Sequence, residues 1–206
     1  MTPRPYPLTF DPRLRTLEGK IELIAQLRSE RPEKSVPLLL ELLCDQSWHV
    51  RERATEALVD RGEDVIGPLS SLLAEGLWYT RACAASALGQ IGAPESLPVL
   101  IGHLDDENAT VRKAVAGALG AMVRRHSNGP ILAALANAGI DPGRSQYAAD
   151  WTTLVHAIAD AGALRASLDA EARAAAGEDG AATDEAQHQA QHGAQHDAKD
   201  EAPAGG

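Results

Sequence analysis

The 206-residue sequence contains few aromatic residues, few cysteines and no long apolar run. Aromatic residues make up 3% of the chain, so alanine and leucine carry most of its apolar content, as expected for helices packed closely through small residues. Both cysteines, Cys44 and Cys83, lie in apolar helical stretches, which predicts reduced core thiols rather than a disulfide framework. No run approaches membrane-spanning length and the first residues lack an apolar signal segment, so we expect a cytoplasmic protein without a membrane partner.

A basic stripe is also missing, although arginine is common. The formal net charge is −10, and the segment from Gly177 onward holds seven acidic residues and one lysine. The remainder of the chain is therefore close to balanced, with arginines and carboxylates interspersed. Nucleic-acid binding proteins concentrate positive charge on one face, so this pattern argues against a nucleic-acid partner.

The sequence does contain an internal repeat with a period near 30 residues. The segments SWHVRERATEALVDRG from Ser47, LWYTRACAASALGQIG from Leu77 and NATVRKAVAGALGAMV from Asn108 align without gaps. Five or more positions agree in all three copies. They include the arginines Arg51, Arg81 and Arg112 and the leucines Leu58, Leu88 and Leu119.

Each copy is predicted to be a hairpin of two helices. Pro37, Pro68 and Pro98 stand before apolar runs and are predicted to open the first helix of each hairpin. In the second helix, apolar residues recur at the spacing of one helical face, as at Val50 and Ala54. One hairpin cannot bury this face alone, whereas stacked hairpins bury it against each other. The pattern therefore predicts an all-α solenoid.

The motif V-R-x-x-A-x-x-A-L-G, preceded by an acidic turn, resembles the short bacterial HEAT repeat of the phycobilisome-lyase-like type. Residues 110–120 and 80–89 carry the motif most closely, while Val59 replaces the usual glycine in the first copy. The resemblance implies a right-handed α-solenoid of about four hairpins with capping helices. It is specific for fold and unspecific for function.

The repeats suggest a division of the chain. We expect an extended segment over residues 1–13, a solenoid over 14–176, and an acidic tail rich in histidine, glutamine and alanine over 177–206. Within the solenoid, clear repeats are predicted at 36–62, 66–92 and 96–123, and a degenerate repeat with a cap at 128–176. The tail has almost no large apolar residue and is predicted to be disordered.

The most regular polar signal is an acidic residue followed six positions later by an arginine. Because an active site rarely occurs in three equal copies, we interpret these pairs as a structural ladder in which each arginine binds turn carbonyls or carboxylates. The pairs are Asp45 with Arg51, Glu75 with Arg81, and Asp106 with Arg112.

Histidines give little support for a metal site. The HEAT-like branch that resembles deoxyhypusine hydroxylase binds two irons through His-Glu pairs, and this sequence contains no such pair. His188, His192 and His196 recur every four residues, a spacing that can chelate a metal on a helix. Gly193 interrupts the segment, so low-complexity drift is the favoured interpretation. We expect no cofactor and no catalytic residue.

Trp48 and Trp78 occupy equivalent positions where the second helix opens, and the family commonly has proline there. Two interpretations remain open for these residues. Each indole can cover the core, or the pair, with Tyr79 beside it, can form an exposed ridge that anchors a partner.

A second candidate surface is a trough along the second helices, formed by positions that face away from the apolar stripe. We expect a non-catalytic scaffold or adaptor that binds a protein or peptide with basic flanks. The family resemblance leaves one alternative, a subunit or chaperone of a bilin lyase system. The predicted trough consists of Ala82, Ala85, Ser86, Gly89, Lys113, Ala116, Gly117 and Gly120, with Glu52 and Glu56 as an acidic edge.

Overall fold

A computed structural model describes residues 11–125, 129–142, 144–163, 165–167 and 169. The chain divides into two units, Met1–Ala161 and Gly162–Gly206. The described residues of the second unit are helical. The predicted tail, with its three spaced histidines, lies outside the described residues.

Among the described residues of the first unit, all regular secondary structure is helical, which confirms the all-α prediction. Short 3-10 turns, η2 (Pro12–Arg15), η3 (Gly62–Val65) and η4 (Pro94–Ser96), precede three of the helices. Residues 152–161 form a further helix. The labelled helices are α1 (Leu17–Leu27), α2 (Pro32–Leu43), α3 (Trp48–Val59), α4 (Ile66–Glu75), α5 (Trp78–Ile91), α6 (Leu97–Ile101), α7 (Ala109–Arg125) and α8 (Gly129–Asn137).

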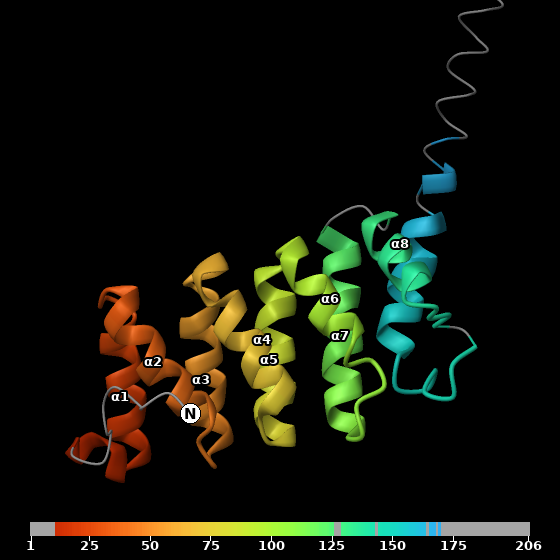
Figure 1. Cartoon of the computed structure of the whole chain (residues 1–206). Helices are drawn as coiled ribbons and strands as arrows, with labels where there is room; N and C mark the ends of the chain where they lie inside the picture. Colours follow the sequence, from red (N-terminus) through yellow and green to blue (C-terminus); the bar gives the residue numbers. More distant parts are fainter. Residues whose placement is uncertain (1–10, 126–128, 143, 164, 168, 170–206) are drawn as a thin grey trace, which may run out of the picture. The chain divides into compact units, whose positions relative to one another are not determined.

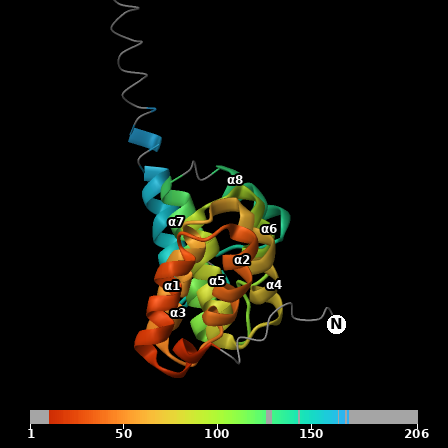
Figure 2. The same cartoon turned by 90° about the vertical axis from the view of Figure 1, so that its left-hand side faces the viewer.

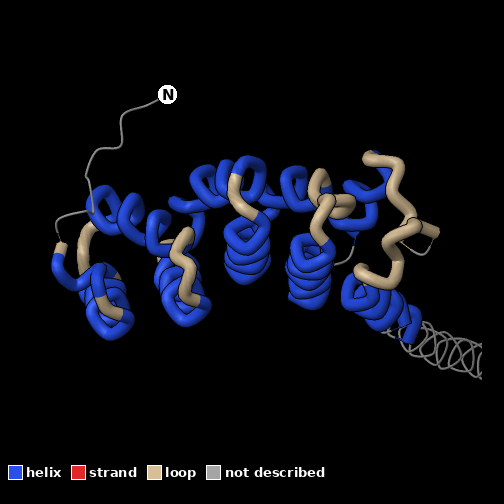
Figure 3. The backbone as a smooth tube through the Cα atoms, turned by 90° about the horizontal axis from the view of Figure 1, so that it is seen from below, coloured by secondary structure: helices blue, strands red, loops and turns tan. Residues whose placement is uncertain are grey.

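The helices of this unit form two layers. The first helices of the hairpins, α2, α4, α6 and α8, lie in one row, while α1, α3, α5, α7 and residues 152–161 form the other (Figures 2 and 3). Successive hairpins stand side by side along the rows (Figure 1). We call the row that begins with α1 the second-helix layer. The turns that open its helices lie at one edge of the unit, which we call the turn edge.

One core runs between the two layers. Leucines from both rows, among them Leu43, Leu58, Leu73, Leu88 and Leu119, are fully buried. They correspond to the repeating apolar positions of the sequence. Each hairpin thus buries its apolar face against its own partner helix and against the next hairpin, as a solenoid requires.

Small residues of the second-helix layer bring α5 and α7 into close contact. A Cβ added to Gly89 would lie 2.4 Å from the Cα of Ala118, so the two backbones meet where the sequence has glycine. One added to Gly120 would lie 3.1 Å from the carbonyl oxygen of Thr153. At these positions, neighbouring helices of the layer therefore pack closely against each other.

This packing shows that part of the predicted trough is wrong. Ala85, Gly89, Ala116 and Gly120 are buried, whereas an open trough required them at the surface. The reason is the tight stacking of the second helices, which covers their sides as well as the stripe facing the first helices.

Two smaller predictions are also corrected. Pro37 does not open its helix: α2 begins at Pro32, which supplies the proline of the first turn, and Pro37 lies inside the helix. Cys44 is not a core thiol, because it follows the last residue of α2 at the turn edge and is exposed. Cys83 is partly buried.

Candidate functional site

The fourth residue of α1, α3, α5 and α7 in the second-helix layer is a cation: Lys20, Arg51, Arg81 and Arg112, respectively. Lys20 Nζ lies 2.5 Å from Asp45 Oδ2, in the turn before the next helix of the layer.

Arg81 and Arg112 bind the next turn in the same way, through one edge of the guanidinium. Arg81 donates from Nε to Asp106 Oδ2 at 2.9 Å and from Nη2 to Asp106 Oδ1 at 2.8 Å. Arg112 donates from Nε to Asp150 Oδ2 at 2.7 Å, and its Nη2 lies 2.6 Å from the same oxygen. Each cation therefore joins its repeat to the following one.

The Nη1 groups of the arginines bind their own turns. Arg51 donates to the carbonyl oxygens of Asp45 and Gln46, and Arg81 to that of Gly76. Arg112 donates to the carbonyl oxygens of Asp106 and Glu107 in the same way. The arginines thus bind turn carbonyl oxygens inside their own repeats and carboxylates of the following turn. None of the three acid–arginine pairs read from the sequence is an ion pair among the described residues, because Arg51 and Arg112 bind the backbone of their own aspartate and Arg81 binds Gly76 instead of Glu75. Sequence reasoning missed Lys20 and Asp150 as members of the ladder, although Lys20 has the same helix position as the arginines.

The Arg81–Asp106 pair illustrates the electrostatics of a closed rung. Its side chains are only 13% and 6% exposed. Burial raises the pKa of Asp106, but hydrogen bonds from Arg81 and from the Asn108 amide outweigh burial and lower it below its ordinary value. The hydrogen bond to Asp106 raises the pKa of Arg81. The pair is therefore ionised and internally neutral, which suits a structural contact.

Arg51 departs from this pattern. Glu75, the register equivalent of Asp106, is the exposed last residue of α4 and forms no ion pair among the described residues. No carboxylate reaches Arg51 within the described part of the chain. Instead its guanidinium carbon lies 4.9 Å from the centre of the Tyr79 ring.

The turn edge at this place exposes large apolar side chains. Trp48 is 58% exposed, Trp78 48% and Leu77 62%. About half or more of each indole is exposed, which contradicts the interpretation of the indoles as covers for the core. Trp48 meets His49 edge to face, and Trp78 meets Tyr79 in the same way.

A groove of about 410 Å³ lies between α3 and α5 beside this edge. We call it the α3–α5 groove. It is lined by five of the predicted partner-binding residues and by four further residues. The predicted members are Trp48, Glu52, Glu56, Ala82 and Ser86, and the added ones are Arg51, Thr55, Cys83 and Gln90.

Lys113 and Gly117 do not line the α3–α5 groove. Both lie on α7, where Lys113 is exposed with Nζ 3.6 Å from Asp150 Oδ1. A Cβ added to Gly117 would meet nothing within 4 Å. The predicted trough is thus restricted to the gap between the first two repeats.

The thiol of Cys83 lines the groove and could act as a nucleophile, but its environment keeps it protonated. Burial raises the pKa of this thiol, and the neighbouring Arg51 and Thr55 only partly oppose the rise. A thiol with a raised pKa carries little thiolate near neutral pH and is a weak nucleophile.

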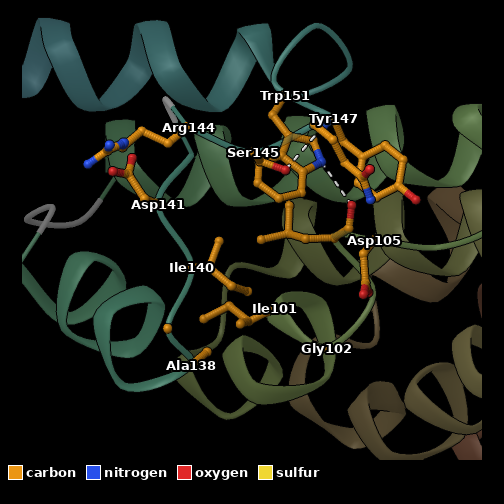
Figure 4. Close-up of a pocket in the computed structure, with 13 residues that line it drawn as sticks. Ile101, Gly102, Asp105, Ala138, Ile140, Asp141, Arg144, Ser145, Tyr147 and Trp151 are labelled. Atoms are coloured by element: carbon orange, nitrogen blue, oxygen red, sulfur yellow. Dashed lines mark hydrogen bonds between the residues drawn. The ribbon is translucent and has the colours of Figure 1, made fainter.

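A larger pocket, about 700 Å³, lies near the C-terminal end of the first unit (Figure 4). Ile101, Ile140 and Trp151 provide apolar surface, and Asp141 and Arg144 lie together at one end. Trp151 donates from Nε1 to the carbonyl oxygen of Leu104 at 2.8 Å, which fixes the indole as part of the wall. The Trp151 indole is buried, whereas Tyr147, the second aromatic residue of the lining, is partly buried.

Within the described residues, no group of three or more His, Cys, Asp or Glu side chains is placed to hold a metal ion. None of the helices in the same residues is long and apolar enough to cross a membrane.

The fold and the ladder define a repeat protein whose hairpins stack through a continuous core and through ionic rungs. A family model for HEAT repeats matches residues 66–150, and a second HEAT-repeat model matches residues 36–60. These two stretches of the chain are HEAT repeats.

Two curated proteins are similar to part of the chain. The phycocyanobilin lyase subunit beta of Pseudanabaena tenuis is 31% identical over 103 residues, which are 50% of this chain and 36% of that protein. The phycobilisome maturation protein of Synechococcus elongatus is 28% identical over 104 residues, which are 50% of each. The chain thus matches half or less of the length of these relatives.

Proposed function

We propose that the protein is a non-catalytic scaffold that binds another protein in the α3–α5 groove. The observation that carries this proposal is the groove itself, which lies between α3 and α5 and is edged by a tryptophan that is 58% exposed. Exposed tryptophans beside a recess are frequent anchors of protein interfaces, because they bury a large area with little loss of conformational freedom.

The polar chemistry of the unit supports a binding role. Arg81, Arg112 and Lys20 are engaged with carboxylates in contacts between repeats, which is a structural use of these charges. In the groove, Cys83 is held as a thiol. The groove therefore offers a recess, an exposed indole and several charged side chains, and these features can recognise a partner protein.

The test is site-specific photo-crosslinking of the full chain in its native host. The photoreactive residue p-benzoylphenylalanine replaces Ser86, which lies exposed in the groove, and in a matched control it replaces Ala133, exposed on α8. We expect a discrete protein adduct from position 86 and none from position 133.

The captured protein is then purified and its affinity measured with the wild type and with Trp48→Ala. Because most of the indole is exposed, the variant should keep the melting temperature while its affinity falls about tenfold or more. Equal labelling at both positions, or an affinity indifferent to Trp48→Ala, would contradict the proposal.

The second candidate function is a role in a bilin lyase system, and the names of the two relatives favour it. The decisive experiment incubates the protein with phycocyanobilin and a bilin-accepting apoprotein and follows covalent attachment by zinc-enhanced fluorescence after denaturing electrophoresis. A scaffold leaves the rate of attachment at its spontaneous value. Acceleration that requires this chain would replace the non-catalytic assignment.

A further inference from the structure

The ionic ladder has one open rung. Three of the four cations at the fourth helix position, Lys20, Arg81 and Arg112, pair with a carboxylate in the following turn at 2.5–2.8 Å. Arg51 occupies the same position of α3 and has no such partner among the described residues. The same guanidinium edge, Nε with Nη2, holds a carboxylate in Arg81 and Arg112 and none in Arg51.

Within the described residues, the Nε atom of this edge also lacks a hydrogen-bond acceptor and is buried, while the guanidinium contacts the Cys83 thiol. Ser35 Oγ and Arg61 Nε share this condition in the same part of the chain, but neither residue lines the groove. An unsatisfied buried N–H is costly, so the Arg51 guanidinium is incompletely bonded in the free protein.

The turn before α5 explains why the rung is open. Asp45 and Asp106 each stand two residues before an amide, of Ser47 and Asn108, that their side chains bind, and this contact places the carboxylate beside the cation. The corresponding turn has Glu75 and Leu77. The Glu75 side chain is one carbon longer than that of aspartate, and the residue is exposed at the end of α4.

We infer that Arg51 receives the missing carboxylate from the bound partner, through an aspartate or glutamate that enters the α3–α5 groove. This inference rests on the proposed function and names the chemistry of the partner segment. A carboxylate against the part of the guanidinium that lines the groove completes the ladder and forms a charge-assisted contact, which is stronger than a hydrogen bond between neutral groups.

The rest of the groove specifies what flanks the acidic residue. Trp48 offers an apolar face on the side of the turn edge. Glu52 and Glu56 follow one and two helical turns along α3, and Glu56 already binds Arg53. A segment with an apolar residue on one side of its carboxylate and a lysine or arginine on the other complements this order of charges.

The experiment uses the full chain as bait for a phage-displayed library of random peptides. Four baits are compared: the wild type, R51Q, the control R31Q and the double variant E75D/L77N. Arg31 is exposed at the start of α2, so R31Q removes the same charge outside the groove. The double variant rebuilds the acidic turn and keeps Gly76, because a Cβ there would lie 2.5 Å from the Leu72 carbonyl oxygen.

Wild type and R31Q are expected to enrich peptides that carry aspartate or glutamate beside an apolar residue. R51Q should lose this enrichment, and synthetic copies of the selected peptides should bind it about tenfold or more weakly, as expected for a charged partner removed from a hydrogen-bonded pair. Replacing the peptide's own carboxylate by its amide should weaken binding to the wild type equally. The double variant, with its rung closed internally, should resemble R51Q while melting at a higher temperature than the wild type.

Circular dichroism and the melting curve show that each bait is folded before selection. Absence of acidic enrichment with the wild type overturns the inference, and so does enrichment that persists in R51Q. Either result leaves the scaffold proposal to be decided by the cross-link at position 86, which does not depend on Arg51.

Discussion

Substituting Arg81 by alanine should destabilise the protein far more than the same substitution of Arg51. Arg81 holds Asp106 by two hydrogen bonds in an interface where the carboxylate is only 6% exposed. After the substitution Asp106 keeps one bond, from the Asn108 amide, and remains largely buried as an anion. Removing one member of a buried ion pair costs on the order of 3–5 kcal/mol. Because Arg81 is partly solvated, we expect about 2–3 kcal/mol for Arg81→Ala.

Arg51→Ala is the matched control, because the residue has the same helix position and binds its own turn but holds no carboxylate among the described residues. It loses two hydrogen bonds to turn carbonyl oxygens, which water can replace at this exposed edge. We expect about 1 kcal/mol for this loss. Urea denaturation followed by circular dichroism measures both values on the full chain. Equal destabilisation by the two variants would refute the ladder, because the carboxylate contact would then contribute nothing.

The same rung predicts how stability depends on acidity. The pKa of Asp106 is lowered in the folded protein, so its contribution is complete above the ordinary aspartate pKa and is lost as the pH falls through the lower folded value. Below about pH 4, the free energy of unfolding of the wild type should therefore fall more steeply than that of Asp106→Asn. If urea titrations gave the same pH dependence of the free energy of unfolding for both proteins, the contact between Asp106 and Arg81 would not stabilise the folded state.

The remaining predictions concern packing. Gly89→Ala should cost about 1–3 kcal/mol, because its Cβ would lie 2.4 Å from Ala118 in the adjacent helix. Gly117→Ala, whose Cβ meets nothing within 4 Å, should raise stability by about 0.5–1 kcal/mol through helix propensity, and thermal melts that rank the two alike would contradict this account of the α5–α7 contact. Trp151→Phe should cost about 1 kcal/mol by removing the donor to the Leu104 carbonyl oxygen, and unchanged stability would mean that this bond does not hold the pocket wall.

The repeat explains why the fold could be predicted from the sequence. Leu58, Leu88 and Leu119 recur in register because each fills the same place between stacked hairpins, and all three are fully buried. Because the pattern occurs three times, its period can be read directly from the sequence, which is rarely possible for a single helix. The sequence predicts helix boundaries less well, because Pro32 and Pro37 are both compatible with the first turn of a helix.

The candidate site was predicted only in part, because sequence spacing does not report the distance between helices. Ala85 and Ser86 are neighbours on α5, yet the first is buried and the second lies in the groove. Lys20 joins the ladder from α1 and Asp150 from the turn before residues 152–161, flanking segments in which the repeat motif is absent. The sequence could not show that Arg51 lacks a carboxylate partner. Glu75 is in register with Asp106 in the sequence, but its side chain does not reach Arg51 in the structure.

The state of the Arg51 guanidinium tests the central claim most directly. Proton–nitrogen correlation spectra of the arginine Nε–H groups, assigned with single Arg→Lys variants, report which of them donate to a carboxylate. We predict downfield Nε–H signals for Arg81 and Arg112 in the free protein and an upfield signal for Arg51. Addition of a selected acidic peptide should move the Arg51 signal downfield and leave the other two unchanged. An Arg51 signal that is already downfield in the free protein, or that does not respond to the acidic peptide, would contradict an open rung completed by a partner.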